Sequence, residues 1–208
     1  MNENDESHWM SIADIMSALM IVFMFISISF LYQILNEKEI YKVRLNKALH
    51  EEFNKDLQNY KAVITEDNIF RFNAPFNIGD DTIPEDFKRV LGDFFPRYIK
   101  LLSSTDLKKE IDEIRVEGHT SKGWGNVSQK QSFISNMNLS QKRASSVLAY
   151  CYNIENEIVN KHISWLQSIL RANGMSFSKL LYKDAYNKVQ DKIRSRRVEF
   201  KVLTKEHR

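Results

Sequence analysis

The run from Trp9 to Leu35 constrains the fold most, because its only charged residue is Asp14. As a helix, this run extends roughly 40 Å, which exceeds the roughly 30 Å hydrocarbon core of a bilayer. Trp9 and Tyr32 lie where interfacial aromatic residues are expected. A secretory signal peptide would begin with basic residues and have a shorter apolar run. The run therefore predicts a single transmembrane helix over residues 9–35, preceded by a polar tail over residues 1–8.

Asp14 is the residue of this run with the greatest chemical consequence. A carboxylate inside a membrane span costs roughly 3 kcal/mol, so such residues usually face a polar cavity or a partner. Ser11 and Ala18 share its helix face at spacings of three and four, which makes that face small and polar. A carboxylate there binds and releases a proton or a sodium ion when its surroundings tune its affinity. If the span begins at Ile15, Asp14 is instead an N-cap in the headgroup region.

The sequence changes character at Asn36. Residues 36–67 are rich in charge, lack Gly and Pro, and place apolar residues three or four positions apart. This pattern predicts an amphipathic connector helix. Its apolar stripe suits packing on the chain's own domain, pairing with a second copy, or lying on a membrane. The stripe consists of Leu45, Leu49, Phe53, Leu57, Tyr60 and Ile64.

The segment 68–208 predicts one compact domain of mixed helices and strands. Alternating apolar residues favour strands at 69–72, 111–117 and 197–203. Helical patterns lie at 84–102, 139–154, 155–172 and 185–195. A polar loop is expected over 121–138, with Asn138 capping the helix that follows. Six glycines and three prolines are few for a turn-rich all-β fold, so the expected fold class is α/β (α+β).

The composition excludes several kinds of site. The net charge of +3 is too small to imply nucleic acid as a partner. A single cysteine excludes an internal disulfide and a cysteine-based zinc site. His119 has no second ligand at metal spacing, so we expect it to pack in a loop. No phosphate-binding loop and no nucleophile–base pair is visible, so we expect no enzyme activity, no metal and no cofactor.

Three segments carry polar groups suited to an anion: 116–121, 136–150 and 195–200. Arg143 is expected on the first or second turn of its helix, and Arg196 and Arg197 at the start of a strand. Guanidinium groups bind carboxylates bidentately, and a helix N-terminus also favours anions. These groups could line a pocket for a peptide carboxylate. The alternative is that Arg143 is a surface residue and Arg197 a structural ion pair.

The three segments together resemble the outer-membrane-protein-A-like peptidoglycan-binding domain. The motifs are V-x-G-H-T at 116–120, N-x-x-L-S-x-x-R-A at 136–144 and R-R-V-E at 196–199. The resemblance covers roughly residues 65–208 and implies a βα sandwich that binds the stem peptide of the cell wall. It implies that Arg143 grips a carboxylate, within a site formed by Thr120, Ser121, Asn136, Leu139, Arg143 and Arg197.

Two departures from that family concern the site. Ser121 stands where the family has an aspartate that meets the peptide amine, so that contact is expected to be weaker or supplied elsewhere. The family's later glycine-rich strand is not evident, and Gly174 to Phe177 is a poor substitute. The loop from 122 to 135 is also long.

The N-terminal segment resembles the B subunit of flagellar stators, in which an aspartate accepts the transported ion. The stretches WMSIADIMSALMIVFMFIS and NLSQKRASSVLAY resemble most closely the B subunit of the Zorya anti-phage defence system. This resemblance implies two B subunits inside a pentamer of an A-type membrane subunit, which turns as an ion, expected to be a proton, passes Asp14. The alternatives are a flagellar-type stator subunit and a passive wall tether without ion transport.

Charge and resemblance disagree on topology. Residues 1–8 contain no Lys or Arg, whereas Lys38, Lys42, Arg44 and Lys47 follow the span. The positive-inside rule would place the large domain in the cytoplasm. The resemblance implies a bacterial inner-membrane protein with a cytoplasmic N-terminus and a periplasmic domain. We follow the resemblance, because a wall-binding domain must reach the wall. In the inverted topology, the basic segment 188–208 would favour a nucleic-acid partner.

Overall fold

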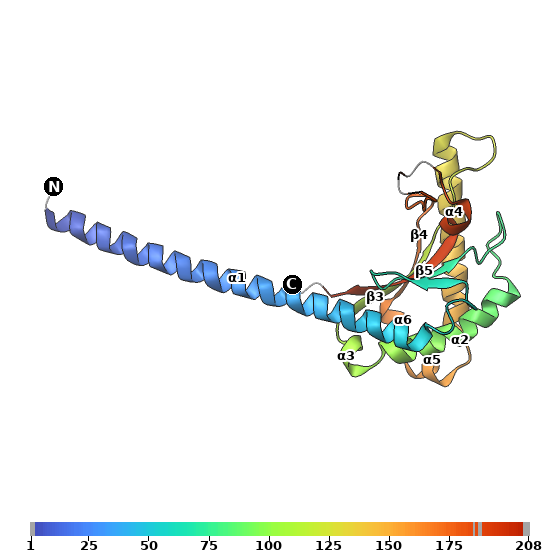
Figure 1. Cartoon of the computed structure of the whole chain (residues 1–208), viewed down its shortest axis with the longest axis horizontal. Helices are drawn as coiled ribbons and strands as arrows, with labels where there is room; N and C mark the ends of the chain where they lie inside the picture. Colours follow the sequence, from blue (N-terminus) through green and yellow to red (C-terminus); the bar gives the residue numbers. More distant parts are fainter. Residues whose placement is uncertain (1–2, 185, 187–188, 206–208) are drawn as a thin grey trace. The chain divides into compact units, whose positions relative to one another are not determined.

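The chain divides into two compact units, Met1–Arg44 and Leu45–Arg208 (Figure 1). The structure is a computed structural model that describes residues 3–184, 186 and 189–205, and the side chains of residues 3–8, 11 and 38 fall outside that description. Each unit is considered by itself.

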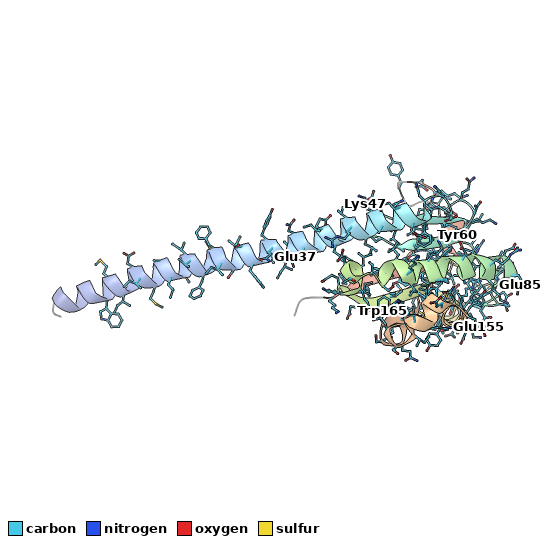
Figure 2. The ribbon with its side chains drawn as sticks, turned by 90° about the horizontal axis from the view of Figure 1, so that it is seen from below. Glu37, Lys47, Tyr60, Glu85, Glu155 and Trp165 are labelled. Carbon is cyan, nitrogen blue, oxygen red and sulfur yellow. The ribbon has the colours of Figure 1, made fainter. Side chains whose placement is uncertain are left out.

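The first unit consists of most of helix α1, which runs from Glu3 to Phe53. By length and composition, α1 is apolar enough from Ile12 onward to cross a membrane. Figure 2 shows its side chains projecting on all sides before Glu37, and the large apolar ones are exposed. The hydroxyls of Ser17 and Ser27 donate to carbonyls four residues earlier, at 2.8 Å, so they are satisfied within the helix. The expected apolar N-terminal helix is confirmed.

The last turns of α1 belong to the second unit. Leu45, Leu49 and Phe53 are buried there, as expected for a helix that packs on its own domain. The helix ends at Phe53, and after a turn the chain forms strand β1, Ala62–Ile64. The prediction of a connector helix over 36–67 is therefore wrong beyond Phe53, and the compact domain begins before residue 68. The reason is that β1 pairs with β2, a tertiary contact that overrides the helical pattern.

The second unit is built on a five-stranded sheet in the order β1-β2-β5-β3-β4. The other strands are β2 (Phe70–Asn73), β3 (Ile111–Gly118), β4 (Leu170–Gly174) and β5 (Arg197–Thr204). β3 and β4 are parallel, and the remaining pairs are antiparallel. The predicted class of mixed helices and strands is confirmed.

The helices of this unit depart from the expected ones in two places. They are α2 (Glu85–Leu102), α3 (Thr105–Lys108), α4 (Gln129–Tyr152), α5 (Glu157–Lys161), α6 (Ile163–Ile169) and α7 (Lys192–Ser195). The cap of α4 is Ser128, whose Oγ accepts from the Gln131 backbone N–H at 3.2 Å. The expected loop is therefore confirmed for 121–128 and wrong for 129–138, the expected cap at Asn138 is wrong, and Arg143 lies well inside α4 rather than near its start.

The second departure is the segment 155–172, which does not form one helix. Two short helices, α5 and α6, are followed by β4, which adds to the edge of the sheet beside β3. β4 ends at Gly174 and supplies the late strand that was not evident from the sequence. The helix expected over 185–195 is confirmed only for 192–195, which form α7, and is wrong for 186 and 189–191, where Gln190 forms a bridge with Tyr182; residues 185, 187 and 188 lie outside the described residues.

An aromatic cluster joins the sheet to the helices on one face. Phe94 of α2 packs against Phe70 and Phe200, with ring centroids 4.5 and 5.1 Å apart. Phe53 at the end of α1 lies 5.3 Å from Phe94. These aromatic side chains are buried in the core, and each removes a large apolar area from water. The opposite face of the sheet carries charged side chains, including Arg71, whose Nε donates to Glu199 Oε1 at 2.6 Å.

Helix α4 approaches β3 and β4 closely enough that only glycine fits at two strand ends. A Cβ on Gly174 would lie 2.6 Å from the Gln141 backbone nitrogen, and one on Gly118 would overlap the Ser140 carbonyl oxygen. Gln141 Oε1 also accepts from the Gly174 N–H at 2.7 Å, and Ser140 Oγ accepts from the Ser176 N–H at 2.9 Å. These contacts fix the loops that follow both strands.

Candidate functional site

An open cavity of about 350 Å³ lies beyond the end of β3. Three segments far apart in the sequence form it: the loop before α2, the loop after β3, and α4. Arg196, just before β5, completes the lining. The lining residues are Ile78, Gly79, Thr120, Ser121, Gly123, Trp124, Gly125, Asn136, Leu139, Arg143 and Arg196. No carboxylate occurs among them, so the cavity is cationic, and we call it the arginine pocket.

The guanidinium of Arg143 is bound in this pocket by backbone carbonyls and not by a carboxylate. Its side chain is 2 % exposed. Its Nε donates to the carbonyl of Asp80 and its Nη2 to the carbonyl of Asn77, both at 2.7 Å, and its guanidinium lies 5.1 Å from the Phe76 ring centroid. No carboxylate of the described residues lies within ion-pair distance of it.

Burial and a neighbouring charge both affect the pKa of Arg143. Burial lowers the pKa of Arg143 to about 10, and the positive charge of Arg196 acts in the same direction. The negative charges of Asp80 and Asp81 offset part of that effect. An anion that entered the arginine pocket would relieve both the burial and the repulsion.

Thr120 and Asn136 supply neutral polar groups to the same pocket. The hydroxyl oxygen of Thr120 is buried without a hydrogen-bond partner among the described residues, which is costly unless a ligand supplies one. Asn136 Nδ2 donates to the Ser132 carbonyl at 2.9 Å and to the Gly123 carbonyl at 3.3 Å. Gly123 has a φ of 116°, a conformation that glycine favours, and this lets the loop fold back toward α4.

The structure brings together five of the six residues expected in the wall-binding site. Thr120, Ser121, Asn136, Leu139 and Arg143 all line the arginine pocket. Arg197 does not, because it is buried on the other side of its strand end, where its Nε donates to Glu199 Oε1 at 2.6 Å. Arg197 therefore matches the alternative interpretation, a structural ion pair. Arg196 lines the pocket, where Arg197 was expected.

A buried charge network lies behind the pocket and was missed in the sequence. His119 Nε2 lies 3.3 Å from Glu199 Oε2 and 3.5 Å from Glu117 Oε2, and each of the three side chains is at most 2 % exposed. The expectation that His119 has no companion ligand is therefore wrong. The period-two spacing of Glu117 with His119, and of Arg197 with Glu199, was the signal that could have revealed it.

This network is already neutralised by protein cations. Glu199 Oε1 accepts from both Arg71 and Arg197, and Lys179 Nζ lies 3.8 Å from Glu117 Oε2. Burial opposes the ionisation of Glu199, but His119 and Arg197 outweigh it and hold the pKa of Glu199 below its usual range. The donor atoms of Glu117, His119 and Glu199 lie within 4.8 Å of one another, as in a metal site. The surrounding cations disfavour a divalent ion there, so we interpret the network as structural.

The expected ion site lies in the first unit. Asp14 and Ala18 are exposed on α1, where a partner could contact them. The side chain of Ser11, the third residue expected on that face, lies outside the described residues.

The fold and the pocket define a class: a small mixed domain with a cationic pocket, joined to an apolar N-terminal helix. No family model matches the sequence. The chain is 39 % identical over 217 residues to Zorya protein ZorB of Escherichia coli, an alignment that covers 97 % of this chain and 90 % of that protein. The chain therefore belongs to the family of Zorya protein ZorB.

Three solved structures are also similar to this chain. One is the cell wall anchor of the type VI secretion system from Pseudomonas aeruginosa, with a TM-score of 0.48, 17 % identity and coverage of 76 % of this chain and 97 % of that one. A MotB-like protein from Desulfovibrio vulgaris has a TM-score of 0.45, 20 % identity and coverage of 80 % and 97 %. An OmpA-like domain from Francisella tularensis has a TM-score of 0.42, 17 % identity and coverage of 70 % and 82 %.

Proposed function

We propose that this chain is the wall-anchored subunit of an ion-driven, stator-like motor of the bacterial inner membrane that serves in anti-phage defence. Membership of the Zorya protein ZorB family supports the defence role. The observation that carries the anchoring role is the buried guanidinium of Arg143, which faces a pocket without a carboxylate partner.

The ligand class for the arginine pocket is a peptide carboxylate of peptidoglycan. The carbonyls of Asn77 and Asp80 hold the Arg143 fork in one orientation, so little rotamer entropy is lost when a carboxylate binds. Arg196 adds a second positive charge, and the buried Thr120 hydroxyl offers a further hydrogen bond. Without a carboxylate in the lining, the pocket lacks a direct partner for a peptide amine, which fits the serine at position 121.

The test of anchoring is sedimentation of the protein with purified peptidoglycan. Arg143→Ala is expected to weaken binding about tenfold or more, because a charge-assisted hydrogen-bond pair is lost. Arg143→Lys keeps the charge but not the fork, and should bind with intermediate strength. Arg89→Ala, an exposed arginine of α2 that pairs with Asp86, is the matched control.

A thermal unfolding curve of each variant separates lost binding from a lost fold, because Arg143 also holds the loop at 77–80. If a folded Arg143→Ala protein sediments as well as the unmutated chain, the pocket is not the anchor.

For the motor role we propose that Asp14 binds the transported ion, expected to be a proton, against an A-type membrane subunit that forms a pentamer around two copies of this chain. A proton that crosses roughly 150 mV releases roughly 3 kcal/mol. Wall anchoring lets that energy turn the partner instead of this chain. The N-terminus would be cytoplasmic and the second unit periplasmic, and a reporter enzyme fused after Arg208 that is active only in the periplasm tests that orientation.

The test of ion transport is phage plating on cells with the complete operon and Asp14→Asn. We expect protection to be lost at equal membrane abundance, since an amide does not exchange a proton in this range. Asp86→Asn, an exposed change on α2, should leave protection intact. Protection retained by Asp14→Asn would leave a passive wall tether as the function.

A further inference from the structure

A second open cavity, of about 750 Å³, lies at the other end of the sheet from the arginine pocket. Helix α3, helix α6, the start of β3 and the end of β5 form it. Its lining residues are Ser103, Thr105, Lys108, Lys109, Ile111, Asp112, Trp165, Ser168, Ile169 and Lys205. Figure 2 shows Trp165 toward the end of α2 that is opposite Glu85. We call this surface the basic pole.

Among the described residues, the lining of the basic pole carries more positive than negative charge. Lys108, Lys109 and Lys205 form no ion pair with any residue of the described ranges, and Asp112 is the one carboxylate of the lining. Lys108 Nζ lies 4.9 Å from the Trp165 ring centroid, which holds that ammonium over the indole. Burial, followed by the charges of Lys108 and Lys161, lowers the pKa of the neighbouring His162, as expected in a positive local field.

The ladder of the sheet places the two sites at opposite ends. Ile111, the first residue of β3, pairs with Thr204 near the end of β5, and the N–H of Lys205 donates to the Glu110 carbonyl at 2.8 Å. Gly118, the last residue of β3, leads into the arginine pocket. The eight residues of β3 separate the sites by roughly 23 Å at about 3.3 Å per residue.

The chain enters the domain at the end of the sheet that carries the basic pole. Asn46 Nδ2 donates to the Thr65 carbonyl at 3.3 Å and to Asn68 Oδ1 at 2.8 Å, in the turn before β2. Phe70 of β2 pairs with Phe200, and Asn73 with Arg197, so that turn lies level with the final residues of β5. The covalent link from the apolar helix therefore arrives at this end, through residues 36–44.

We propose that the basic pole binds the anionic phosphate headgroups of a bilayer surface. Lysines that form no ion pair with the described residues are available to the anionic lipids that attract such groups, and an indole beside them suits the headgroup layer, where tryptophan concentrates. The end of the domain at which the membrane-linked chain arrives favours a bilayer over an anionic wall polymer. This inference rests on the proposed membrane anchoring of the chain.

The test uses the full chain in nanodiscs, with Trp165 as the probe. The sequence has three tryptophans, so Trp9→Phe with Trp124→Phe leaves Trp165 alone. The measured quantity is the ratio of Trp165 emission without and with headgroup spin-labelled lipid. We expect at least twofold quenching in nanodiscs that contain phosphatidylglycerol and little in phosphatidylcholine alone. Added salt should reduce the quenching, because it screens exposed charges.

A matched pair of triple variants identifies the lysines. Replacing Lys108, Lys109 and Lys205 by Gln is expected to weaken docking of the domain on the bilayer. The ratio of docked to undocked domains should fall on the order of a hundredfold, at about fivefold per lysine. Replacing Lys122, Lys130 and Lys142, which are exposed around the other end of the domain, makes the same change in net charge and should leave quenching unchanged.

The outcomes are distinct. Any one of three results would overturn the proposal: equal quenching in both lipids, equal loss of quenching in both triple variants, or binding of soluble polyphosphate without quenching by the bilayer. Failure of the chain to enter nanodiscs would instead contradict the membrane anchoring.

Discussion

At the scale of single residues, two adjacent arginines have different surroundings. Arg196 is half-buried and lines the arginine pocket, whereas Arg197 is buried and bonded to Glu199. The R-R-V-E motif predicted that an arginine here serves the site, but it did not show which one. The choice depends on the register of β5 against β2 and β3, and register follows from tertiary pairing that no local pattern contains.

The two arginines should therefore respond differently to the same substitution. Arg197→Ala is expected to lower the free energy of unfolding by about 3 kcal/mol, because it removes a cation from a buried ion network. Arg196→Ala should leave the unfolding free energy within about 0.5 kcal/mol and weaken sedimentation with peptidoglycan. Urea denaturation and sedimentation of both variants check this, and the reverse assignment would contradict the geometry.

The network around Glu199 also predicts sensitivity to acid. The pKa values of Glu199 and Glu117 are both held low in the folded state, where burial is outweighed by His119 and neighbouring cations. A carboxyl whose folded pKa is depressed contributes stability above its unfolded pKa, roughly 4.3, and this stability is lost as the pH falls through the folded value.

We expect the unfolding free energy of the domain to fall below roughly pH 4, and Glu199→Gln to show a smaller fall from a lower starting value. Denaturation curves at neutral and acid pH measure both. Glu85→Gln, at an exposed position of α2, should keep the full pH dependence. The same dependence in Glu199→Gln would exclude this carboxylate as its source.

At the scale of elements, local signals predicted strands β2, β3 and β5 and helix α2 within a residue or two. The elements that differ from the prediction are those that depend on contacts between residues distant in the sequence. β4 has only the residues Leu170 to Gly174 and forms because it pairs with β3. Gln129 to Asn138 looked like a loop because it is polar, yet Ser128 caps it as helix. Three of the pocket residues, Asn136, Leu139 and Arg143, lie on that one helix.

Two glycines offer opposite outcomes for one substitution. Gly118→Ala is expected to lower the unfolding free energy by about 2 kcal/mol or more, because its Cβ would overlap the backbone of α4 at Ser140. Gly92→Ala in α2 would meet only the Tyr150 hydroxyl oxygen at 3.8 Å, and should stabilise by up to about 1 kcal/mol through helix propensity. Thermal unfolding of both variants checks the signs, and stabilisation by Gly118→Ala would rule out the close approach.

At the scale of the whole molecule, the compact domain includes the end of α1. Leu45, Leu49 and Phe53 are fully or almost fully buried in it. Each such side chain contributes roughly 2 kcal/mol through burial, and the sum is a large part of an ordinary domain's stability. The sequence pattern showed their apolar stripe but could not show which surface covered it.

Two fragments test that boundary. The fragment 45–208 should unfold cooperatively in urea, whereas 68–208, which lacks the helix end and β1, should be unfolded or molten at room temperature. Circular dichroism and tryptophan emission follow both. A cooperative transition of equal midpoint in the shorter fragment would show that the end of α1 is not part of the core.

The opposite placement of chain entry and arginine pocket determines how the domain would bear mechanical load. If a ligand holds the Gly118 end and the link at Leu45 is pulled, the tension runs along β2, β5 and β3. The ladder hydrogen bonds lie across that direction, so they would be sheared together instead of being unzipped one after another. In the 45–208 fragment, we expect a higher unfolding force when the protein is pulled between residues 45 and 196 than when it is pulled between residues 45 and 205. Pulling at residue 205 peels β5 from one end. Such a sheet would hold an anchored chain under sustained pull.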